Sequence, residues 1–170
     1  WNKFNNLFLD EEPKEKPVLY LSGNILVDDN LVVNKKAIIE PGTIFSIMPN
    51  KSIIFKKQVI CKGTLGKPIV FKKFMDDKKE KVAPWGTVAL IGKNTKGSVF
   101  DFTHFEGGSG GRFNQFLFTS MFSIHDTLDV EINNSLFSSN EIYDDTIHIV
   151  YAKNISLKNT KTLKAYRDAI

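Results

Sequence analysis

The sequence predicts an all-β fold, a right-handed parallel β-helix, in which the chain winds as a solenoid of about seven turns, or rungs. Short apolar runs rich in β-branched and aromatic residues lie between Gly, Pro and Asn turns, and each run is too short for a helix. Residues 38–55 show this best, with runs that flank turns at Pro41-Gly42 and Pro49-Asn50. The unit recurs every 20 to 25 residues, whereas an antiparallel sandwich would not place like residues on like at one offset.

Glycines of the recurring unit mark the expected corners. Gly42-Thr43-Ile44 is followed 21 residues later by Gly63-Thr64-Leu65 and after 23 more by Gly86-Thr87-Val88. Glycine permits a positive φ and a close approach of the backbone, both of which suit a sharp corner. We therefore expect these three glycines at equivalent or neighbouring corners of successive rungs.

The last third of the chain repeats at an offset of 25 residues. Six pairs match in character: Phe122 with Ile147, Ile124 with Ile149, Val130 with Ile155, Ile132 with Leu157, Asn134 with Asn159, and Ser135 with Thr160. Residues 99–105 fit the same template, with Phe100 and Phe102 in the places of Val130 and Ile132. Because alternate residues of a strand face inward, these two phenylalanines and the eight apolar residues of the pairs should form one buried column. The two asparagines should form an amide ladder at a corner.

An N-terminal cap and linker are expected over residues 1–17, ahead of the β-helix of residues 18–170. Phe4, Leu7 and Phe8 share one face of a short helix, and residues 11–17 are polar. A helical cap there would cover the strand edges and apolar core of the first rung.

Two polar stretches between the strands are predicted to be loops. Residues 72–83 are highly charged and should form a solvated loop. Residues 106–112 contain four glycines and should form a flexible loop.

The length and composition of the chain are those of an ordinary single-domain protein. Of the 170 residues, 42% are hydrophobic and 25% are charged, and no apolar run is long enough to be a transmembrane segment. Cys61 is the only cysteine, which excludes an internal disulfide, and its apolar neighbours predict a buried side chain. The net charge of +4 is mild and the lysines interleave with acids, so no nucleic-acid-binding stripe is predicted.

Acidic residues near the C-terminus are candidates for catalysis or metal binding. Asp168 follows Asp144 and Asp145 by 24 and 23 residues, so it can stack one rung away from them, and Arg167 adjoins it. Close carboxylates repel unless they share a proton, bind a cation or are screened by water. The alternatives are a solvated corner paired with Lys and Arg, which we favour, a calcium site at the three aspartates, and a general acid/base pair. No other cofactor is expected.

Three tyrosines near these acids, Tyr143, Tyr151 and Tyr166, are candidate glycan-binding residues because a flat ring can stack on a pyranose face. The three histidines show no zinc-ligand spacing, and we expect them at surface or corner positions.

Several motifs resemble bacterial right-handed β-helix repeat proteins of the pectate-lyase-like superfamily. They are Ile38-Ile39-Glu40-Pro41-Gly42-Thr43, Gly63-Thr64-Leu65, Pro68-Ile69-Val70-Phe71, Pro84-Trp85-Gly86, residues 143–147 and residues 166–170. The resemblance covers residues 18–170 and implies a secreted, periplasmic or cell-surface protein in which the helix is one module. Enzymatic members cleave acidic polysaccharides with Asp, Arg or Lys, commonly with calcium, but no motif here transfers those catalytic residues.

The repeat, the resemblance and the lack of a catalytic motif predict a non-catalytic module. It would act as a scaffold or as a rod that binds a polysaccharide or a partner protein. The alternative is a polysaccharide lyase or hydrolase of acidic glycans, with its site at the acidic residues and Arg167. Residues 154–170 still have the pattern of a rung, so we expect the helix to continue, to be capped beyond residue 170, or to dock on another module or subunit.

Overall fold

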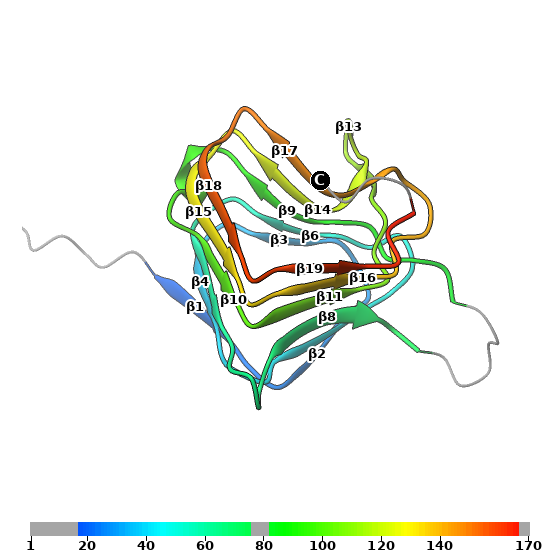
Figure 1. Ribbon diagram of the computed structural model, residues 1–170, viewed down its shortest axis with the longest axis horizontal. Coiled ribbons are helices and arrows are strands. Elements are labelled where there is room, and N and C mark those ends of the chain that lie inside the picture. The colour runs from blue at the N-terminus through cyan, green and yellow to red at the C-terminus, as the bar shows by residue number, and fades with distance from the viewer. Residues whose placement is uncertain (1–16, 76–81, 167–170) are drawn as a thin grey trace, which may run out of the picture.

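The computed structural model describes residues 17–75 and 82–166, which wind through three parallel sheets as a solenoid (Figure 1). Sheet A lies on the left of Figure 1, sheet B below and sheet C above. Each strand passes to the next sheet, so that three strands make one rung. Sheets A and B each contain six strands among the described residues, which gives six rungs where the sequence predicted about seven.

The strands are short, as the sequence predicted. Sheet A consists of β1 (Val18–Leu21), β4 (Lys36–Ile39), β7 (Val59–Lys62), β10 (Val99–Asp101), β15 (Leu128–Asn133) and β18 (Lys153–Lys158). Sheet B consists of β2 (Asn24–Val27), β5 (Ile44–Ile47), β8 (Ile69–Lys73), β11 (Thr103–Glu106), β16 (Leu136–Ser138) and β19 (Lys161–Leu163). Sheet C consists of β3 (Leu31–Val33), β6 (Ile53–Phe55), β9 (Val88–Ile91), β14 (Ser120–His125) and β17 (Asp145–Val150).

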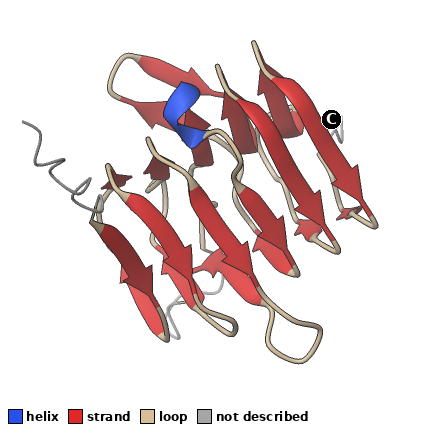
Figure 2. Cartoon of the chain, turned by 90° about the vertical axis from the view of Figure 1, so that its left-hand side faces the viewer, coloured by secondary structure: helices blue, strands red, loops and turns tan. Residues whose placement is uncertain are grey.

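Two further elements interrupt this regular winding. A 3₁₀ helix, η1 (Lys93–Thr95), lies between β9 and β10, at the top of the view onto sheet A in Figure 2. An antiparallel hairpin of β12 (Gly111–Phe113) and β13 (Phe116–Phe118) lies between β11 and β14. The predicted cap helix falls outside the described residues. None of the helical segments in residues 17–75 and 82–166 has the length and apolar character to cross a membrane.

The 25-residue register is confirmed in sheets A and C. Phe122 pairs with Ile147 in sheet C, and Ile132 pairs with Leu157 in sheet A. The register predicted for residues 99–105 is wrong by two residues, since Phe100 pairs with Ile132. Phe102 instead forms the corner after β10, where its φ is 45° and its side chain is only half-buried. β10 has three residues where β15 has six, so the corner after β10 comes earlier in the sequence than the 25-residue template predicts.

The predicted apolar column lies in the core along most of its length. Phe100, Phe122, Ile124, Val130, Ile132 and Ile147 are buried. Ile149, Ile155 and Leu157 are partly buried and pack against that core from the last described rungs. Cys61 is also fully buried, as predicted, and the burial raises the pKa of its thiol.

A second column, of stacked phenylalanine rings, runs along the inner face of sheet B. Phe45 and Phe71 have ring centroids 4.6 Å apart, and Phe71 and Phe105 are 5.0 Å apart. Phe105 and Phe137 continue the stack at 4.7 Å. The parallel register places one ring over the next in the four successive rungs from β5 to β16, which is why the many phenylalanines fit a narrow core.

Only two of the three recurring glycines share a corner. Gly42 and Gly63 both lie between sheets A and B, at the A/B corner, in successive rungs. Gly86 lies before β9, at the B/C corner, and belongs to the same rung as Gly63. The 23-residue spacing from Gly63 to Gly86 is therefore produced by the long connection between β8 and β9 rather than by the repeat.

The asparagine ladder at the A/B corner is confirmed. Asn159 Nδ2 donates to Asn134 Oδ1 at 3.2 Å, and Asn134 Nδ2 donates to Asp101 Oδ1 at 2.9 Å. Both asparagines have a positive φ, 49° for Asn134 and 52° for Asn159, which asparagine tolerates better than most residues. The ladder thus joins three successive rungs at the A/B corner.

The hairpin covers part of the outer face of sheet C and half-buries a histidine. Phe118 packs with Ile54 and Ala89 in a small cluster outside the main core. His125 lies beside it, with its ring 5.5 Å from the Phe118 ring and 5.4 Å from the His148 ring. His125 Nε2 is buried without a hydrogen-bond partner among the described residues. Burial, and the nearby charge of His148, lower the pKa of His125.

We expect the stability of the folded chain to fall as the pH drops below the ordinary histidine pKa of about 6.5. Folding lowers the pKa of His125, so as the pH falls the unfolded state binds the proton first. This proton binding stabilises the unfolded state relative to the folded state. Urea unfolding at a series of pH values should show this slope, and His125→Gln should reduce it. Burial also lowers the pKa of His104, so a residual slope should persist. An identical slope in the variant would contradict the assignment to His125.

Candidate functional site

The longest connections of the solenoid meet at the B/C corner, on the right of Figure 1. They are residues 74–87 between β8 and β9, of which 76–81 are not described, and residues 107–119, which include the hairpin. Residues 139–144, between β16 and β17, lie at the same corner. In a solenoid, long connections gather on one side in this way and often form the binding surface.

Two hollows at this corner share Ser139 and Glu141. The larger, of about 860 Å³, lies between residues 83–84, 139–142 and 164–166. The smaller, of about 380 Å³, adjoins the end of β8, Met75 and residues 106–107. We call the two together the corner groove.

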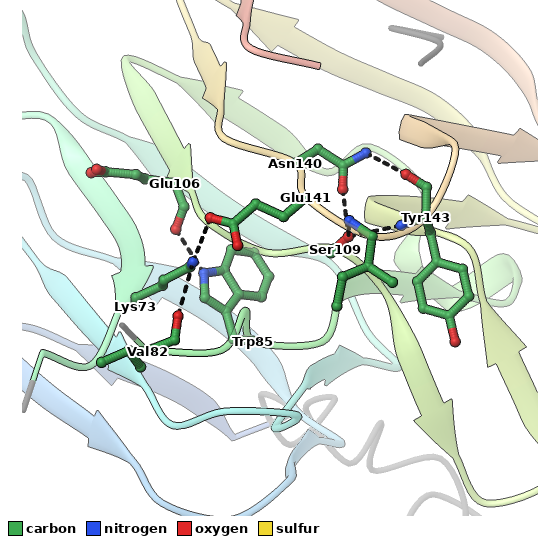
Figure 3. A network of polar contacts seen from close by, with 9 residues as sticks. Lys73, Val82, Trp85, Glu106, Ser109, Asn140, Glu141 and Tyr143 are labelled. Atoms are coloured by element: carbon green, nitrogen blue, oxygen red, sulfur yellow. Dashed lines mark hydrogen bonds and ion pairs between the residues drawn. The ribbon is translucent and has the colours of Figure 1, made fainter. Parts of the chain in front are cut away.

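Ser109 and Asn140 hold the wall of the corner groove in place (Figure 3). Ser109 Oγ donates to Asn140 Oδ1 at 2.7 Å and accepts the backbone N–H groups of Ile142 and Tyr143 at 2.7 and 3.0 Å. Asn140 Nδ2 donates to the carbonyl oxygens of Tyr143 and Asp145 at 2.8 and 3.0 Å. Both side chains are buried, so this network fixes the path of residues 140–145 from inside.

Trp85 lies buried next to this network. Its side chain is fully buried, and Trp85 Nε1 donates to the carbonyl oxygen of Glu106 at 2.8 Å. The backbone of Ser109 donates to the carbonyl oxygen of Trp85 at 3.0 Å. A Cβ on Gly108 would lie 2.6 Å from the Trp85 ring, so only glycine allows the chain to pass so close.

Glu141, which lines both hollows, is held by an ion pair. Lys73 Nζ donates to Glu141 Oε1 at 2.6 Å and to the carbonyl oxygen of Val82 at 3.2 Å (Figure 3). The Lys73 side chain is largely buried, at 17% exposed, whereas that of Glu141 is 37% exposed. The pair ties the end of β8 to the segment after β16 and leaves the Glu141 side chain partly exposed in the lining of the groove.

The predicted glycan-binding tyrosines do not lie together. Tyr166 lines the larger hollow and is 53% exposed. Tyr143 belongs to the same corner, but its backbone is held by Ser109 and Asn140 and its ring packs closely on Gly110. Tyr151 lies between β17 and β18, at the C/A corner, and is 89% exposed.

The predicted acidic site is described only in part. Asp145 is the first residue of β17 and Asp144 directly precedes it, and Asp145 Oδ2 accepts a hydrogen bond from Thr119 Oγ1 at 3.4 Å. Arg167 and Asp168 lie outside the described residues. Within residues 17–75 and 82–166, no group of three or more His, Cys, Asp or Glu side chains is arranged to hold a metal ion.

The residues that shape the groove were not among those predicted from the sequence. The glycine-rich stretch predicted to be a flexible loop is buried from Gly107 to Gly110 and places Ser109 at the centre of the network. In the charged stretch predicted to be a solvated loop, Lys73 is paired and Val82 is buried. A run of glycines beside a serine is as typical of close backbone approach as of a flexible loop. This pattern was the signal in the sequence that could have identified the buried position of Ser109.

Comparison with known proteins gives no match: no family model, no curated protein and no solved structure matches this chain.

Proposed function

We propose that the chain is a non-catalytic solenoid module of an exported or cell-surface protein and that its corner groove binds a glycan. The observation that carries the proposal is the lining of the larger hollow. Tyr166 and Ile142 expose 53% and 55% of their surfaces there, next to the Glu141 carboxylate and to Lys164. A glycan site needs this combination of flat apolar surface with a few fixed polar groups.

The wall behind the groove is rigid, which supports the interpretation that the groove is a binding site. The Ser109–Asn140 network satisfies the buried polar groups of the wall internally, so its shape does not depend on a ligand. A preformed site loses little conformational entropy when it binds. Its mixed charge favours an uncharged or weakly charged oligosaccharide.

We further propose that the solenoid winds in the right-handed sense of a pectate-lyase-like β-helix. Crossover connections between parallel strands of one sheet are right-handed in nearly all proteins, because of strand twist. Export remains a proposal that rests on the same resemblance.

Binding to the corner groove is tested with a panel of neutral oligosaccharides, the β-linked oligomers of glucose, xylose and mannose. We expect at least one to bind, and Tyr166→Ala to weaken that binding about fivefold by removing about 1 kcal/mol of ring contact. Tyr20→Ala is the matched control, since Tyr20 is 65% exposed on β1, away from the groove. No binding, or equal losses in the two variants, would contradict the proposal.

A lyase or hydrolase of acidic glycans remains the second candidate, because Lys72, Lys73, Glu106 and Glu141 all line the smaller hollow. Incubation with pectate and alginate, with and without calcium, separates the two functions. We expect no shortening of either polymer. Turnover abolished by Glu106→Gln would replace the non-catalytic proposal with the enzymatic one.

A further inference from the structure

Lysines that are far apart in the sequence lie together at one corner of the solenoid. Three successive segments at the C/A corner, residues 34–36, 56–58 and 92–98, contain two lysines each and no aspartate or glutamate, and Lys36 is the first residue of β4. We call these segments the lysine turns. Their lysines are Lys35, Lys36, Lys56, Lys57, Lys93 and Lys96.

Hydrogen bonds hold the lysine turns in register. The backbone N–H of Ala37 donates to the carbonyl oxygen of Gln58 at 2.9 Å. Gln58 Nε2 in turn donates to the carbonyl oxygen of Gly97 at 2.8 Å. Neighbouring rungs are therefore stacked at the spacing of parallel strands, about 4.8 Å. Figure 2 shows η1 at this corner.

A hollow of about 350 Å³ lies between the lysine turns. Lys35, Lys36 and Lys57 line it together with the amides of Asn34, Gln58 and Asn94, and no carboxylate of the described residues contributes to the lining. Of the six lysines, Lys96 pairs with Asp129 at 3.4 Å, and no described carboxylate is in ion-pair contact with the other five. A cleft lined by one sign of charge concentrates ions of the opposite sign.

The positive column has a defined length. Asp126, at the next turn of the same corner, and Asp129, in β15 directly after it, reverse the sign of the charge. The lysine turns therefore span three rungs, on the order of 10 Å along the solenoid axis at the parallel-strand spacing. This length suits a short stretch of an extended polymer.

We propose that the lysine turns bind a sulfated polysaccharide that lies along the solenoid axis. A sugar unit is similar in length to the rung spacing, so two lysines per rung match a polymer with more than one negative group per sugar. The lysine turns contain no aromatic residue on which nucleic-acid bases could stack. They also contain no large apolar residue that could enter a lipid surface.

The test uses the full chain and dextran sulfate as the probe, with affinity measured by calorimetry at several salt concentrations. The variant Lys35→Gln/Lys57→Gln/Lys93→Gln should bind about tenfold more weakly and show a smaller salt dependence, because fewer counterions are released. The control Lys62→Gln/Lys67→Gln/Lys158→Gln has the same net charge, with its exposed positions near the A/B corner, and should change affinity less than about twofold.

Other probes decide the class of ligand. Unsulfated dextran should not bind, and polygalacturonate, with one carboxylate per sugar, should bind more weakly than dextran sulfate. Failure of dextran sulfate to bind, or equal losses in the two triple variants, would overturn the proposal. So would a DNA duplex or phosphatidylserine vesicles that bind as tightly and with the same dependence on the lysine turns. Tyr166→Ala should leave dextran sulfate binding unchanged, which separates this result from that for the corner groove.

Discussion

Replacing Phe105 by alanine is expected to lower the free energy of unfolding by about 3–5 kcal/mol. Its ring is fully buried and lies between those of Phe71 and Phe137, nearly parallel to both, at 5° and 2°. It also contacts the rings of Phe100 and Phe122. A stacked core cannot collapse around the hole, because every rung is fixed by its neighbours. Urea unfolding measures the loss.

Phe116→Ala is the matched control for this prediction. Phe116 is 61% exposed in the hairpin, so its replacement should change stability by less than about 0.5 kcal/mol. Phe105→Leu provides a second measurement in case Phe105→Ala does not fold. It should lower the free energy of unfolding by less than the alanine variant does. A loss below about 1 kcal/mol in Phe105→Ala would show that the aromatic column does not support the fold.

Replacing Asn140 by alanine is expected to cost about 2–4 kcal/mol, because buried polar groups lose their partners. The carbonyl oxygens of Tyr143 and Asp145 lose a donor, and the Ser109 hydroxyl loses its acceptor. Urea unfolding measures the cost, and hydrogen exchange should become faster at the amides of Ile142 and Tyr143. Asn24→Ala, at the exposed start of β2, should change stability by less than about 0.5 kcal/mol. Unchanged exchange at both amides would contradict the role of Asn140.

The register of the last rungs could be predicted because their connections have equal lengths. Val130 to Ile155 and Phe122 to Ile147 keep one offset, and the pairs lie side by side in the structure. Where connections differ in length, the same reasoning fails. Gly86 and Phe102 were misplaced because a long connection and a short segment change the number of residues per rung.

The corner groove could not be predicted, because its parts come from segments that do not repeat. Ser109 and Asn140 are 31 residues apart, and Lys73 and Glu141 are 68 apart, so no offset connects them. The candidate tyrosines were chosen for ring chemistry and proximity in sequence. Only the winding of the chain decides that Tyr166 reaches the groove while Tyr151 lies at another corner.

The central claim, that the corner groove is the binding site, is tested most directly by following backbone amide resonances of the isotope-labelled chain. The titrant is the neutral oligosaccharide of the panel that binds most tightly. We predict that the largest shifts occur at residues 139–142 and 164–166, which line the larger hollow. Shifts confined to sheet A or to the lysine turns would contradict the claim.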